Sequence, residues 1–272
     1  MTEPVRLLSV APSPAFWVAV VMYALAGAAL LGVLAGHAKL RPVAIAIVIG
    51  AFVAHGVDIG WRGTQHVHPA QSVREAIGFL AFLLTGGYLL TSLRYRFTLG
   101  GVVIMPVSVI LLVLARLSPA GHATGDLTAL GRIHISLATL GVGVFAIASA
   151  LSVIYLVEDR ALKKKKFDAI AFKDRGAPLE GLDRLAHRLI WVGFPIFTLS
   201  LVLGAVWVSK LGQSLDRLEY PLAAVTWLAY AALLIARTAY GWRGRRAAIL
   251  TLQGFASALA VLLIYLVRRM VE

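Results

Sequence analysis

Eight apolar segments of membrane-spanning length recur along the 272-residue chain. Each runs for about 18 to 25 residues, and an α-helix of that length crosses a hydrocarbon core of about 30 Å. None of them alternates in polarity with the period of a membrane β-strand. The segments are residues 15–35, 43–61, 73–93, 100–117, 133–157, 189–209, 221–240 and 247–267. We therefore predict an all-α, polytopic transmembrane helix bundle of about eight spanning helices, with residues 15–272 as its single domain.

The formal net charge of +13 is concentrated in the links between these segments. Most lysines and arginines fall in the first, third, fifth and seventh links, which the positive-inside rule places in the cytoplasm. Both termini, including the tail at residues 1–14, are then extracytoplasmic, and residues 158–188 form a basic cytoplasmic loop. This distribution predicts a multi-pass protein of a bacterial cytoplasmic (inner) membrane, with the lipid bilayer rather than nucleic acid as the partner of its positive charge.

The chain contains no cysteine. This excludes disulfides, thiolate metal ligands and covalent attachment of heme to this chain. Any iron held here needs nitrogen, oxygen or methionine sulfur ligands, and imidazole is the first candidate.

Three histidines, His55, His134 and His187, lie in or against apolar segments, where an ionisable group is a candidate functional residue. His55 is followed by Asp58 on the same helix face, so the pair suits a ligand, a proton relay or a polar contact between helices. His134 begins the fifth segment on the outer side. His187 begins the sixth on the cytoplasmic side, too far across the bilayer to share an iron with His134.

The remaining histidines carry weaker signals. His66 and His68 form a His-x-His pair in the second link, but a third ligand at fixed spacing is missing, so we expect a loop feature rather than a metal site. His122 lies on the same predicted face, and His37 lies in the first link beside basic residues.

Several short motifs follow one another in a recognisable order. They are Ala54-His55, Gly60-Trp61-Arg62, His68-Pro69, Arg74-Glu75, Leu182-Asp183-Arg184-Leu185, Gly193-Phe194-Pro195, Gly204-Ala205-Val206-Trp207, Trp227-Leu228-Ala229-Tyr230 and Gly241-Trp242-Arg243-Gly244. This order resembles the cytochrome c assembly family that includes CcsA and the shorter HemX-like membrane proteins. The resemblance covers most of the chain from the second segment onward.

The resemblance implies heme as the cofactor and other cytochrome c maturation membrane proteins as partners. It makes His55 the intramembrane heme histidine and His134 the first external one, both as iron ligands. The expected cofactor-binding set also includes Trp61, Arg62 and His187. The resemblance implies that the shorter relatives carry a histidine near the sixth segment, as this chain does at His187.

The chain also departs from the family pattern. A tryptophan-rich segment expected after Trp207 is replaced by residues 208–217, Ile235 stands where a second intramembrane histidine is expected, and the chain has no histidine after the last segment. The HemX-like subgroup is the closer match, and a heme-binding or assembly factor is expected rather than a complete heme lyase.

Three functions remain open at this point. The first is a membrane protein of cytochrome c assembly type that binds or handles heme through membrane and outer-face histidines. The second is a non-enzymatic HemX-like regulator or scaffold that acts through its basic cytoplasmic loop. The third is a small transporter with a His55 and Asp58 proton relay, which ranks last because paired broken segments of an inverted repeat are missing from the sequence.

Overall fold

The computed structural model describes residues 12–65, 67–69, 72–94, 97–117, 129–164, 179–210 and 217–271. Several predicted features lie outside these residues, namely most of the N-terminal tail, His66, His122, residues 165–178 of the basic loop and residues 211–216 after Trp207. Within the described ranges the chain forms helices and no strand.

Eight of the described helices are long and apolar enough to cross a membrane, which confirms the predicted polytopic helical fold. They are α1 (Pro14–Leu34), α2 (Arg41–Thr64), α3 (Val73–Arg94), α4 (Thr98–Leu117), α5 (Ala129–Lys163), α7 (Leu179–Lys210), α8 (Glu219–Ala239) and α9 (Arg245–Val271). A 3-10 turn, η1 (Ala38–Leu40), leads into α2. Ser13 caps α1 by accepting a hydrogen bond from the Phe16 amide, and Pro14 occupies the first helical turn, where its missing N–H costs nothing.

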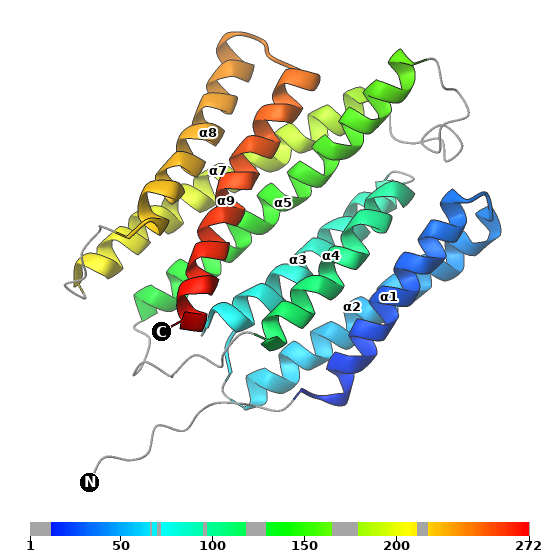
Figure 1. The fold of residues 1–272 in the computed structure, drawn as a ribbon, viewed down its shortest axis with the longest axis horizontal. Helices are drawn as coiled ribbons and strands as arrows, with labels where there is room; N and C mark the ends of the chain where they lie inside the picture. Colours follow the sequence, from blue (N-terminus) through cyan, green and yellow to red (C-terminus); the bar gives the residue numbers. More distant parts are fainter. Residues whose placement is uncertain are drawn as a thin grey trace.

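The helices divide into two halves, α1 to α4 and α5 with α7 to α9, which lie side by side in Figure 1. In each half the first helix packs on the second and fourth, and the third packs on the same two. The halves meet mainly where α3 packs against α5. α1 begins and α9 ends at the same end of the bundle (Figure 1), as an even number of spans requires.

α5 and α7 are the longest helices and the most closely packed pair. A Cβ built on Gly141 of α5 would lie 3.3 Å from the Phe197 backbone nitrogen of α7, so a side chain at this position would push the helices apart. The close approach places the first turns of α5 beside the last turns of α7. It thereby brings His134 of α5 against Ser200 and Trp207 of α7.

Both helices run further than the apolar pattern predicted. α5 has 35 residues and α7 has 32, about 50 Å each at 1.5 Å per residue, so both exceed a core of about 30 Å. Residues 158–163 and 179–188, which flank the basic loop on its two sides, are helical. Their polarity ended the hydropathy signal, but ion pairs one turn apart, Lys163 with Asp159 and Arg184 with Glu180, support a helix there.

The link between α8 and α9 is a fixed turn. Gly241 and Gly244 adopt φ values of +65° and +67°, the left-handed region that glycine enters without strain. The Asp183 carboxylate of α7 accepts hydrogen bonds from both Arg237 terminal nitrogens, at 3.0 and 2.7 Å, and from the Gly244 amide at 3.1 Å. One carboxylate therefore holds the ends of three helices together.

Candidate functional site

His55 lies inside the first half of the bundle and is 2% exposed. Its ring contacts Tyr23 of α1 and Phe82 of α3, both edge to face. The Tyr23 hydroxyl lies 3.2 Å from His55 Nδ1, which is a hydrogen bond in either tautomer. The imidazole is therefore held by aromatic groups from two neighbouring helices.

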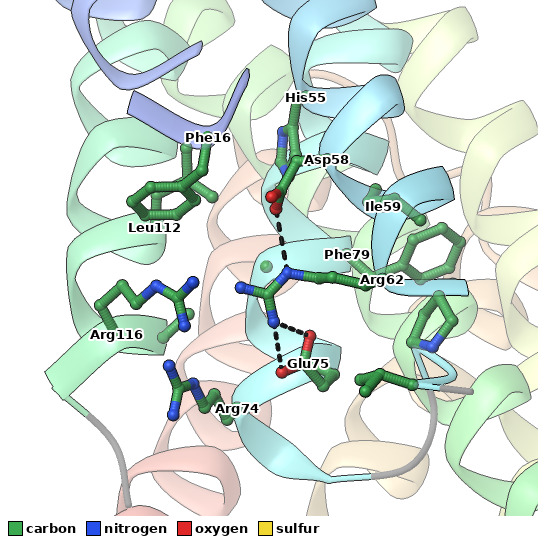
Figure 2. Close-up of a pocket in the computed structure, with 14 residues that line it drawn as sticks. Phe16, His55, Asp58, Ile59, Arg62, Arg74, Glu75, Phe79, Leu112 and Arg116 are labelled. Carbon is green, nitrogen blue, oxygen red and sulfur yellow. Dashed lines mark hydrogen bonds and ion pairs between the residues drawn. The ribbon is translucent and has the colours of Figure 1, made fainter. Parts of the chain in front are cut away.

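Asp58 and Arg62 lie one turn apart on α2, below His55 in Figure 2. Asp58 accepts a 2.6 Å hydrogen bond from the Ser13 hydroxyl and a 3.1 Å bond from Arg62 Nε. Arg62 Nη1 in turn donates to both oxygens of Glu75 on α3, at 2.8 and 2.9 Å. We call Ser13, Asp58, Arg62 and Glu75 the buried charge network. It differs from the expected His55 and Asp58 pair, because the Asp58 carboxylate bonds to Ser13 and Arg62.

A pocket opens beside this network, between α1, α2, α3 and α4 (Figure 2). Its lining includes His55 and two arginines outside the network, Arg74 of α3 and Arg116 of α4. The cavity volume is about 30 Å³, which accommodates water molecules or one small polar group. A porphyrin ring does not fit into this space without displacement of the helices.

His134 lies in the other half of the bundle, where the first turns of α5 meet the end of α7. Its Nδ1 lies 2.8 Å from the Ser200 carbonyl oxygen, so it donates a hydrogen bond there and carries the ring proton. Its ring packs over Gly204, where a Cβ would lie 2.6 Å from His134 Cε1. The Trp207 indole lies beside it, with ring centroids 5.9 Å apart. This arrangement directs the Nε2 lone pair away from the Ser200 contact.

The other predicted site residues are placed apart from these two. Trp61 is 53% exposed on the surface of α2, whereas its neighbour Arg62 is buried in the charge network. His187 lies in the third turn of α7, at the opposite end of that helix from Ser200, and its Nε2 accepts a 3.1 Å hydrogen bond from Trp191. Its buried Nδ1 has no hydrogen-bond partner among the described residues.

The pocket between α1, α2, α3 and α4 is lined by His55 but not by His134. A second, open groove at the start of α5 is lined by His68 and Arg132, with Ile133 and Ser136. The described part of the chain contains no group of three or more histidine, aspartate and glutamate side chains that could hold a metal ion.

Sequence reasoning missed three partners of these residues, Ser13, Tyr23 and Ser200, and one residue that lines the pocket, Arg116. Arg116 is visible in the sequence only as a basic residue near the end of an apolar segment, and the other three are polar groups that occur in many membrane helices. Glu75 was noted in the motif order, but its ion pair with Arg62 follows only from the packing of α2 against α3.

The fold and these sites define a multi-pass helical membrane protein with two separately placed histidines, His55 buried and His134 half-buried. The model of the cytochrome C assembly protein family matches residues 71–272, and the chain belongs to that family. The matched range includes Glu75, Arg116, His134 and Trp207, whereas His55 lies before it.

Individual relatives agree with this assignment. The cytochrome c biogenesis protein CcsA of Guillardia theta is 29% identical over 243 residues, covering 81% of this chain and 77% of the relative. The CcsA protein of Gloeobacter violaceus is 28% identical over 272 residues, covering 79% of this chain and 78% of the relative. The CcsA protein of Nostoc sp. is 44% identical over a shorter stretch of 79 residues. No solved structure matches the chain. The protein is thus a multi-pass membrane protein of cytochrome c assembly.

Proposed function

We propose that this cytochrome c assembly protein binds heme through the imidazole of His134, with His55 as a second ligand position inside the membrane. The observation that carries the proposal is the hydrogen bond from His134 Nδ1 to the Ser200 carbonyl oxygen, because it sets the tautomer of the imidazole. Histidines that ligate metals almost always donate the second ring N–H to a carbonyl or carboxylate, which fixes the tautomer and the ring orientation. The Nδ1 bond to the Ser200 carbonyl supplies that partner and leaves a neutral imidazole with Nε2 for iron.

The surroundings of His134 also suit a porphyrin. Trp207 offers an aromatic face beside the imidazole, and the site lies at the end of α7 rather than in the closed interior of the bundle. His55 is more enclosed, and its pocket is too small for a porphyrin. Heme at His55 would therefore have to enter between helices, so we place His134 first.

The decisive experiment is a heme titration of the purified protein in detergent, followed by its Soret band. His134→Ala should weaken heme binding by about ten-fold or more, because it removes the ligand nitrogen. Gly204→Ala should weaken binding in the same direction, because its Cβ would displace the His134 ring. His37→Ala is the matched control, since His37 is exposed in the link between α1 and α2.

The same titration separates the two ligand positions. If both histidines bind iron, His55→Ala alone should shift the Soret band, and the double variant of His55 and His134 should lose it. A Soret band and affinity that remain unchanged in the double variant would contradict the proposal.

We further propose that the protein handles heme without attaching it, as expected for the HemX-like subgroup. The support is the missing tryptophan-rich segment after Trp207 and the missing second histidines. On this proposal the protein passes heme to, or takes it from, other cytochrome c maturation proteins in a bacterial cytoplasmic membrane. Its tail and His134 then face outward, and the basic loop faces the cytoplasm.

A second candidate function is a regulator or scaffold that acts through the basic loop. The observation that favours it is the length of α5 and α7, which carry the loop well beyond the membrane core. In this alternative the loop binds a partner protein, and heme binding is secondary.

A further inference from the structure

Arg116 in the last turn of α4 carries a charge that the described protein does not pair. Its Nε, Nη1 and Nη2 are all buried, and none of them has a hydrogen-bond partner. Its guanidinium carbon lies 4.9 Å from the centre of the Phe16 ring, a cation–π contact that leaves all five N–H groups unused. Burial of a guanidinium without a counter-ion or hydrogen bonds costs free energy. We therefore expect Arg116 to have a binding partner.

Arg62, the arginine of the buried charge network, is paired, unlike Arg116. Arg62 already donates to Asp58 and to both oxygens of Glu75, and the two carboxylates are in turn engaged with it. The pocket is thus lined by three guanidinium groups against two carboxylates, which leaves one positive charge in excess. Figure 2 shows Arg74 and Arg116 turned toward the same space, with Arg62 on its far side.

We propose that Arg116 and Arg74 form a binding site for a single oxyanion group, a carboxylate or a phosphate, that belongs to a ligand larger than the pocket. The guanidinium fork suits both groups, because it donates two parallel hydrogen bonds to a planar or tetrahedral oxyanion. The cavity of about 30 Å³ accepts such a group but not the body of its ligand. The rest of the ligand then lies outside the pocket.

The position of the two arginines limits what that ligand is. Arg74 lies in the first turn of α3 and Arg116 in the last turn of α4, so both lie where their helices leave the hydrocarbon core. An amphiphile with its anion at the membrane surface fits this depth. Two sources share the chemistry, a lipid headgroup phosphate and a porphyrin propionate. The propionate source rests on the proposed heme function, whereas the phosphate source does not.

The test compares ligands that differ only in the anion, with the full-length protein in detergent. One arm measures dioleoylphosphatidylglycerol against dioleoylglycerol by native mass spectrometry. The other measures ferric heme against its dimethyl ester by the Soret band. In at least one arm the wild-type protein should prefer the anionic member by about ten-fold, and Arg116→Gln should abolish most of that preference. Arg184→Gln, an exposed arginine on α7, should keep it.

The pattern of results identifies the source. Loss of preference in the lipid arm assigns the site to a phosphate, and loss in the porphyrin arm assigns it to a carboxylate. If heme fails to bind at all, the proposed heme function fails, but the lipid arm still tests the site. The inference is overturned if the wild-type protein shows no preference for the anionic ligand in either arm. It is also overturned if Arg116→Gln shows the same preference as wild type.

Thermal stability supplies an independent readout. Because Arg116 is unpaired in the ligand-free protein, Arg116→Gln should not lower the Tm measured without lipid or heme. Addition of the preferred anionic ligand should raise the Tm of wild type more than that of the variant. A large loss of Tm in ligand-free Arg116→Gln would show that the charge already has a stabilising partner, and would overturn the inference. Arg116→Lys keeps the charge without the fork and should bind with intermediate affinity.

Discussion

At the residue scale, the buried charge network is the part of this protein most sensitive to substitution. Asp58 and Arg62 are 3% and 8% exposed, and Arg62 is the only cation of the network. One guanidinium therefore pairs with the buried Asp58 carboxylate and with the half-buried Glu75 carboxylate. Ser13 adds a second role, because the hydroxyl that caps α1 also donates to Asp58 and so ties the start of α1 to α2.

Arg62→Gln should lower the stability of the protein in detergent by about 3 to 5 kcal/mol, since it leaves the buried Asp58 carboxylate without its ion-pair partner and removes both bonds to Glu75. Asp58→Asn should cost less, because Arg62 keeps both bonds to Glu75 and the amide still accepts from Ser13. Thermal unfolding of both variants measures the difference. Equal losses for the two would show that Arg62 does not act as the shared partner.

Arg184→Gln is the matched control at this scale. Its ion pair with Glu180 spans 3.7 Å between largely exposed side chains, and exposed pairs contribute little. The Tm of this variant should stay close to that of wild type.

At the scale of elements, α5 and α7 decide where the second site lies and how far the loop projects. Their close approach at Gly141 brings Ser200 of α7 within hydrogen-bond distance of His134 of α5. Their opposite ends continue as polar helices beyond the apolar segments. The same two helices therefore connect the candidate heme site to the basic loop.

If the loop binds a partner protein, replacement of the four lysines at residues 163–166 by glutamine should remove that partner in cross-linking and mass spectrometry. The physical reason is loss of four positive charges from the basic loop. The Soret band should not change, because His134 lies at the other end of α5.

A matched variant neutralises Arg243, in the link between α8 and α9, together with Arg245 and Arg246 in the first turn of α9. Those arginines lie on the same predicted side of the membrane but outside the loop. A partner set that does not respond to the lysine variant, or responds equally to both, argues against the scaffold function.

At the scale of the whole molecule, eight spans in two halves place alternate links on opposite sides of the membrane. The side that each link faces is a prediction from its basic residues. The chain contains no cysteine, so single introduced thiols can report that side without a background.

His37→Cys and Gln65→Cys place a thiol at exposed positions at the two ends of α2. An impermeant maleimide added to intact cells should label Gln65→Cys, whereas His37→Cys should react only after the membrane is permeabilised. The reversed pattern would place the basic links and His187 outside, and His134 inside.

The sequence by itself determined the helical class, the number of spans and their approximate positions. These depend on local composition and length, because every backbone hydrogen bond of a lipid-exposed segment must be made within the helix. It also located His55 and His134, since an ionisable residue within an apolar segment is visible without any partner.

Only the tertiary structure decided what these residues touch. Ser13 reaches Asp58 across 45 residues, Arg62 reaches Glu75 across 13, and His134 reaches Ser200 across 66. The unpaired Arg116 beside Arg74 likewise follows from the packing of α4 and α3 around one pocket. The length and apolar composition of a segment predict that it spans the membrane as a helix. They do not specify which other helix packs beside it. The partners of each buried polar group are therefore set by helix packing, at distances along the chain that no local pattern records.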